Sequence, residues 1–175
     1  FGSHLWSMRF GDVNTQGLEA LAVDASGNVV VAGNFDGAID FGGSALQSAG
    51  MNDMFVAKFD PDGTHLWSKR FGDGATQTIR SVAIDSAGDI VAVGSFAGTV
   101  QFTGVGALSS AGGEDIFIAK LAGDTGTGSW SKRLGGRGGS GGELGRGRRF
   151  RKFRYGRLVP RHGRLRPRAP HLGRR

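Results

Sequence analysis

The sequence repeats itself at a separation of 61 residues. Residues 4–12 (HLWSMRFGD) return as residues 65–73 (HLWSKRFGD), and a third copy begins at residues 130–133 (WSKR). Self-similarity at one fixed period means that each unit is a supersecondary element that buries its faces only against its neighbours. The repeat therefore limits the fold to an array of stacked units before any local propensity is considered.

The correspondence extends through the whole unit. Residues 22–27 recur as residues 83–88 at the same separation, whereas residues 53–58 recur as residues 115–120 at a separation of 62. Trp67 recurs as Trp130 at a separation of 63. We place the added residues in segments between strands, because single insertions there cost little closure entropy.

Each unit is predicted to hold four short strands. Residues 18–24 and 28–35 flank a tight turn that ends in Gly27, and we expect them to pair as a hairpin. Residues 54–59 and 65–71 flank the turn Asp60-Pro61-Asp62-Gly63 and form a second hairpin. Both hairpins contain consecutive apolar residues, which a strand tolerates when both of its faces are covered. The sheets are therefore expected to stack face to face, with the less apolar strand 65–71 on the outside.

A unit of four antiparallel strands, apolar on both faces, is typical of a propeller blade. The strings at residues 55–63, 66–72, 83–88 and 98–100 resemble the SBBP-type β-propeller repeat of bacterial secreted and cell-envelope proteins. The resemblance covers residues 1 to about 134. It implies several consecutive blades, an extracytoplasmic (secreted or cell-surface) location, frequent lipoprotein anchoring and no shared catalytic motif.

The predicted fold class is all-β, made of incomplete β-propeller blades followed by an unstructured basic C-terminal tail. Residues 1–134 are the propeller segment, which begins with the outer strand of one blade. Two blades follow, at about residues 11–71 and 72–134. Residues 135–175 form the Arg/Gly-rich tail.

The tail differs sharply in charge from the repeats. Residues 1–134 carry 8 basic and 14 acidic residues, whereas residues 135–175 carry 14 basic residues and the single acid Glu143. Read one nucleotide later, the degenerate codons of residues 144–152 can encode SVAVDASGN, which is nearly the string at residues 81–89. We therefore interpret the tail as a third blade translated out of frame. The alternative is a nucleic-acid or polyanion-binding arm, in which arginines contact phosphates and aromatic residues stack on bases.

Composition sets further bounds. The chain has no cysteine, which excludes disulfides and thiolate metal sites. No apolar run reaches the length of a bilayer, so no transmembrane segment is predicted, and we find no targeting signal. The acidic repeats disfavour specific nucleic-acid binding by the folded part.

Each candidate site residue has a structural explanation that we prefer. Asp60-Pro61-Asp62-Gly63 has a carboxylate spacing that resembles a calcium loop, but it lacks the remaining ligands and reads as a turn. Asp24 and Asp85 are expected to cap hairpin turns. The recurring tryptophans are expected to pack between blades rather than stack on a sugar, and two recurring histidines to lie exposed at strand starts. These residues are Trp6, Trp67, Trp130, His4 and His65. His162 and His171 lie in the shifted frame and carry no inference.

We predict no catalytic, metal or cofactor-binding residue and no cofactor, and the ligand-binding residues stay unknown. The first hypothesis is a scaffold or binding module that contacts a protein or carbohydrate ligand through the connectors 42–52 and 104–114, with further blades of the same propeller as partners. The second is part of an enzyme whose site lies in blades absent from this chain. Nucleic-acid binding depends on the tail alone.

Overall fold

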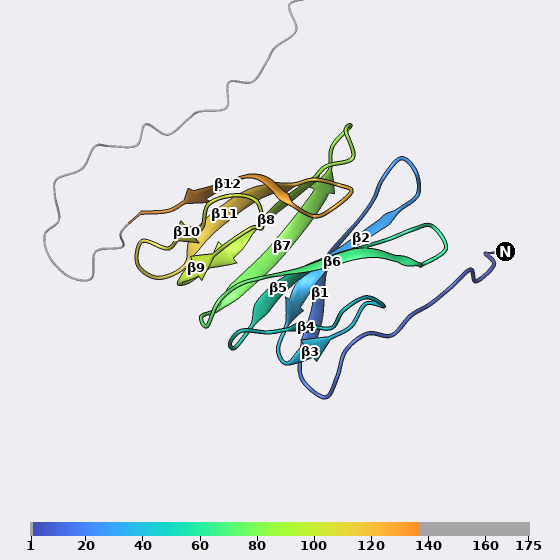
Figure 1. The fold of residues 1–175 in the computed structure, drawn as a ribbon, viewed down its shortest axis with the longest axis horizontal. Coiled ribbons are helices and arrows are strands. Elements are labelled where there is room, and N and C mark those ends of the chain that lie inside the picture. The colour runs from blue at the N-terminus through green and yellow to red at the C-terminus, as the bar shows by residue number, and fades with distance from the viewer. Residues whose placement is uncertain (1, 137–175) are drawn as a thin grey trace, which may run out of the picture. The chain divides into compact units, whose positions relative to one another are not determined.

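The computed structural model describes residues 2–136, and within them it contains strands, turns and bends but no helix (Figure 1). Two antiparallel sheets of four strands each carry the fold, with strand orders β1-β2-β5-β6 and β7-β8-β11-β12. Sheet 1 consists of β1 (Gln16–Val23), β2 (Val29–Phe35), β5 (Asp53–Phe59) and β6 (His65–Phe71). Sheet 2 consists of β7 (Gln77–Ile84), β8 (Ile90–Phe96), β11 (Asp115–Leu121) and β12 (Gly128–Leu134). The predicted all-β fold of incomplete blades is confirmed.

The hairpin turns form as the sequence indicates. Gly27 has a φ of 81° and Gly63 a φ of 85°, the left-handed region that a residue without a Cβ adopts at little cost. The carboxylate of Asp24 accepts hydrogen bonds from the backbone N–H groups of Ser26 and Asn28 at 2.9 Å each. Asp85 accepts the equivalent bonds in sheet 2, from Ala87 and Asp89. The prediction that these two aspartates cap turns is confirmed.

The connector between the second and third strands of each sheet holds a small hairpin that the sequence did not predict. β3 (Ala38–Ile39) pairs with β4 (Leu46–Gln47), and β9 (Thr99–Val100) pairs with β10 (Leu108–Ser109). Strands of two residues are too short to show a period in the sequence. Both connectors lie at the opposite end of the strands from the hairpin turns, because the strands run antiparallel.

The two sheets stack face to face, and the main core lies between them (Figure 1). β7 runs against β1, β2 and β5 of sheet 1. Small side chains, Ala20 and Ala22, face the core on β1, whereas β6 contributes the large side chains of Trp67 and Phe71. Phe71 reaches Phe102, with a ring-centroid distance of 5.0 Å.

The predicted outer strand of a preceding blade is wrong as a strand, because residues 2–10 adopt no strand structure. A strand needs a partner strand for its backbone hydrogen bonds, and residues 2–10 pair with none of the strands described in residues 2–136. The segment still lies where the repeat predicts. Phe10 contacts Phe41 at a ring-centroid distance of 5.0 Å, the same distance that separates Phe71 from Phe102. We call residues 2–10 the N-terminal arm.

The predicted tail lies outside the described residues from residue 137 onward. Its interpretation as an out-of-frame blade, its unstructured state and the domain division at residue 134 stay predictions. His162 and His171 lie in the same part of the chain.

Candidate interaction faces

The contact between the two sheets shows what each face of a unit is built to meet. From sheet 1, alternate side chains of the central and outer strands are buried against sheet 2; these are Val30, Ala32, Met54, Val56, Trp67 and Phe71. From the second unit, the opposing buried side chains are Ile79, Val82, Ala92 and Phe117 of sheet 2 and Val100 and Phe102 of its connector. This interface therefore joins two faces. One is the face of a unit that looks towards the following unit, and the other is the face of that following unit that looks back.

Polar groups of sheet 1 also bind the backbone of sheet 2. Asn34 Oδ1 accepts a hydrogen bond from the buried N–H of Ile79 at 2.9 Å. Lys58 Nζ and Trp67 Nε1 both donate to the carbonyl of Gly123, at 2.9 Å and 3.2 Å. These contacts fix the register of the two sheets, because a buried donor or acceptor without a partner costs free energy. Of these three residues, only Trp67 was predicted from the sequence to pack between units; the roles of Asn34 and Lys58 were not predicted, although Lys58 recurs as Lys120.

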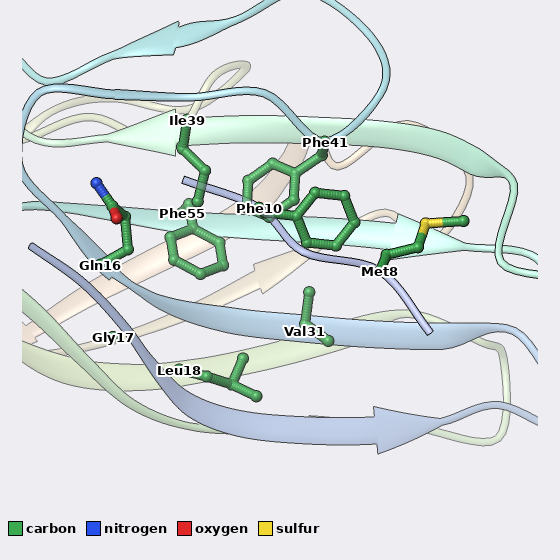
Figure 2. Close-up of a pocket in the computed structure, with 9 residues that line it drawn as sticks. All are labelled: Met8, Phe10, Gln16, Gly17, Leu18, Val31, Ile39, Phe41 and Phe55. Carbon is green, nitrogen blue, oxygen red and sulfur yellow. The ribbon is translucent and has the colours of Figure 1, made fainter. Parts of the chain in front are cut away.

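No described sheet covers the other side of sheet 1, where Leu18, Leu21 and Val23 are exposed but Phe41 and Phe55 are buried beside Phe10 of the arm. We call this side the N-face; its side chains are Leu18, Leu21, Val23, Val31, Phe41 and Phe55. Leu18 is 61% exposed, whereas its equivalent Ile79 in sheet 2 is 1% exposed. A hollow of about 290 Å³ lies on this face, and Figure 2 shows Leu18 and Val31 on one side of it and the rings of Phe10 and Phe41 on the other. The hollow lies where sheet 1 would meet a preceding unit.

Sheet 2 also has a face that no described sheet covers, the face that points away from sheet 1. We call this side the C-face; its side chains are Val91, Val93, Ile116, Ile118, Trp130 and Leu134. Trp130 is 39% exposed and Leu134 is 54% exposed, while the equivalent Trp67 and Phe71 are 8% and 1% exposed. The tryptophan packs between sheets where a following sheet is present, as predicted, and lies open where none is described.

A polar cleft of about 480 Å³ lies at the end of the strands where the hairpin turns meet. Asp24, Asn28 and Lys58 line it from sheet 1, and Asp89, Gly123 and Asp124 line it from sheet 2. Lys58 Nζ lies 3.0 Å from Asp24 Oδ2 with both side chains nearly buried. The Asn28 side-chain amide, together with Lys58 and the backbone N–H groups of the turn, lowers the pKa of Asp24 to about 2. Its carboxylate therefore stays charged at neutral pH.

The aspartates that begin β5 and β11 bind the backbone of the connectors before these strands. Asp53 Oδ2 lies 2.8 Å from Arg70 Nη1 and accepts the N–H of Ala49, and Asp115 repeats both contacts with Arg133 and Ala111. Asp53 Oδ1 is buried and has no hydrogen-bond partner within residues 2–136. This ion pair was not predicted from the sequence, although the recurrence of Asp53 with Arg70 as Asp115 with Arg133 is a signal that could have indicated it.

The remaining sequence candidates are structural. Asp60 Oδ1 accepts the N–H groups of Asp62 and Thr64, which makes the Asp60 segment a turn, as predicted. His65 begins β6 as predicted, but it is half-buried because its ring packs against Phe59 and its Nε2 lies 3.1 Å from Ser68 Oγ. His4 is exposed. Trp6 Nε1 donates to the carbonyl of Pro61 at 2.9 Å, which is the bond that Trp67 makes to Gly123.

Residues 2–136 contain no group of three or more His, Asp or Glu side chains arranged to hold a metal ion. They also contain no helix long and apolar enough to cross a membrane.

No family model matches the chain. The chain is 29% identical over 106 residues to an uncharacterized WD repeat-containing protein, L264, of Acanthamoeba polyphaga mimivirus. The match covers 54% of this chain and 7% of that protein, so the chain spans a small part of its relative. Together with the two stacked four-stranded sheets, this similarity supports a β-repeat architecture of the propeller kind.

Proposed function

We propose that the chain is a non-catalytic β-propeller repeat segment that acts as a scaffold or binding module. The observation that carries this proposal is the recurrence of the same polar contacts in both units. Asp24 and Asp85 cap turns, Asp53 and Asp115 pair with arginines, and each pair performs the same structural role. A catalytic site needs units that differ at their polar positions, because its groups have distinct roles.

The connectors 42–52 and 104–114 are the proposed contact surface for a protein or carbohydrate ligand. They lie at one end of both sheets and carry exposed side chains such as Ser44, Gln47 and Glu114. Loops presented by a rigid sheet are where binding residues concentrate. Further units of the same kind are the proposed partners of the N-face and the C-face.

We further propose that the segment belongs to the SBBP type and lies in a secreted or cell-envelope protein. This step is supported by the sequence resemblance over residues 1–134. An enzyme whose site lies in other blades is the alternative, and no described side chain favours it over the scaffold.

The test compares two sets of substitutions in the full chain. The first replaces exposed connector residues (Ser44→Ala, Gln47→Ala and Glu114→Ala), and the matched control replaces exposed residues at the turn end (Ser26→Ala, Asp62→Ala and Ser86→Ala). Both are measured on a glycan array and a panel of immobilised envelope proteins. We expect binding to fall tenfold or more in the first set and to stay unchanged in the control.

Two results would count against the proposal. Binding that depends on the turn end would move the contact surface to the polar cleft. Release of reducing sugars or peptides from the same panel would show catalysis and end the scaffold hypothesis.

A further inference from the structure

The N-face and the C-face are the two halves of the interface already formed between the sheets. Leu18, Leu21 and Val23 are equivalent by the repeat to Ile79, Val82 and Ile84, which pack into the core against sheet 1. On the C-face, Ile116, Trp130 and Leu134 are equivalent to Met54, Trp67 and Phe71, which pack into the same core. The two outer faces of one chain are therefore equivalent to the two faces that meet between sheet 1 and sheet 2 of the same chain.

We propose that the C-face of one copy of this chain docks on the N-face of a second copy, head to tail. The occupant is a second copy because each open face matches a half that this same chain buries. The inference concerns assembly and does not depend on the ligand proposed above. An interface between two different surfaces leaves one free face at each end of a dimer. Growth therefore continues until a ring closes.

The N-terminal arm shows how the docked strand would bind. Trp6 donates to the carbonyl of Pro61, and Phe10 packs on Phe41 and Phe59, at ring-centroid distances of 5.0 Å and 5.4 Å. Residues 130–134 (WSKRL) repeat the pattern of residues 6–10 (WSMRF). In the docked pair, Trp130 of the second copy takes the place of Trp6, and its Leu134 takes the place of Phe10.

Lys120 adds a polar contact that the arm lacks. Its equivalent Lys58 donates to the carbonyl of Gly123, the residue equivalent to Pro61. Lys58 and Lys120 lie on the third strand of their sheets, whereas the arm corresponds only to the fourth strand, so a docked sheet brings a hydrogen-bond donor that residues 2–10 do not contain. Docking therefore displaces the arm rather than adding to it.

The experiment uses the full chain and two substitutions that each block one face. Leu18→Arg places a charge on the N-face and Ile116→Arg places one on the C-face, and both positions are exposed, so the fold of a single chain is retained. Val13→Arg is the matched control, because Val13 is 99% exposed and belongs to neither face. Sedimentation velocity is measured after nuclease treatment and in 0.5 M salt, where charges are screened beyond roughly 4 Å. Under these conditions nucleic acid bound to the basic tail does not link chains together.

We expect the wild type and Val13→Arg to form species larger than a dimer as concentration rises. Each blocked variant alone is expected to be a monomer. Their equimolar mixture is expected to form a 1:1 dimer and nothing larger, because one chain offers an intact C-face and the other an intact N-face. Leu21→Arg and Leu134→Arg serve as a second pair if circular dichroism shows that a first variant has lost its strands.

Three results would overturn the proposal. A monomeric wild type at all concentrations would show that the faces do not meet. Homodimers of either blocked variant would show that like faces pair. A mixture that stays monomeric would show that the two faces are not complementary.

Discussion

β5 of sheet 1 and β11 of sheet 2 have closely similar sequences and very different surroundings. All seven residues of β5, DMFVAKF, are buried, whereas β11, DIFIAKL, buries only alternate residues. Ile116 is 54% exposed, and its equivalent Met54 is completely buried. The strand sequence therefore does not decide its own burial. A neighbouring sheet does, because sheet 2 covers Met54, whereas nothing in residues 2–136 covers Ile116.

Polar contacts within a unit behave differently. Asp115 binds Arg133 at 2.8 Å although it lies next to the open C-face, and Asp53 binds Arg70 at the same distance inside the array. Contacts of this kind join residues of one sheet and do not need a neighbour. Ion pairs within a sheet therefore form in a single unit, whereas burial of the apolar sheet faces needs a pair of units.

Large aromatic residues give the largest expected difference between equivalent positions. We expect Phe71→Ala to lower the free energy of unfolding by about 3–5 kcal/mol, since Phe71 is buried between the sheets. Leu134→Ala is expected to change it by no more than about 0.5 kcal/mol, because Leu134 lies on the open C-face. Urea unfolding followed by circular dichroism measures both, at a concentration low enough to keep the chain monomeric. Equal losses would mean that the C-face is covered in solution.

The recurring lysine gives the next contrast. Lys58→Ala leaves Asp24 nearly buried without its cation, and we expect a loss of about 3 kcal/mol. Lys120→Ala breaks partly exposed ion pairs with Asp85 and Asp89, and we expect a much smaller loss of stability because solvent screens these charges. Chemical denaturation of both variants tests the pair. A larger loss at Lys120 than at Lys58 would contradict the role of burial.

The hydrogen bond between sheets offers a smaller contrast. Asn34→Ala removes the acceptor of the buried Ile79 N–H, and we expect a cost of about 1–3 kcal/mol. Ser95→Ala, at the equivalent position on sheet 2, is expected to cost no more than about 0.5 kcal/mol. Amide hydrogen exchange at Ile79 provides a direct readout, because Asn34→Ala should speed it while Ser95→Ala should not.

The pH dependence is expected to be the smallest effect. The pKa of Asp24 is lowered from 3.8 to about 2 by the Asn28 amide, Lys58 and the turn N–H groups, so its contribution to stability is complete above about pH 4. That contribution is lost as the pH falls through the folded-state pKa. Comparing thermal midpoints of the wild type and Asp24→Asn should show a gap above pH 4 that narrows towards pH 2. A gap that widens on acidification would reverse the sign and contradict the assignment.

Particular residues show how much the sequence could predict. The strand at residues 65–71 was predicted with its observed bounds, and the turns at Gly27 and Gly63 formed as expected, because period and turn chemistry are local signals. The hairpins β3–β4 and β9–β10 were missed, since two-residue strands have no period. The arm was predicted as a strand from its repeat alone, but strand structure also depends on a pairing partner, which is not a property of the arm's own residues.

The sequence by itself determined the repeat, the four strands of each unit and the turns between them, because these depend on neighbours within a few residues. Only the tertiary structure decided which apolar side chains are covered. Leu18 and Ile79 occupy the same place in two units, yet one lies open and the other is buried. The physical reason is that burial of a sheet face is a contact between units, and its outcome depends on whether a partner sheet is present.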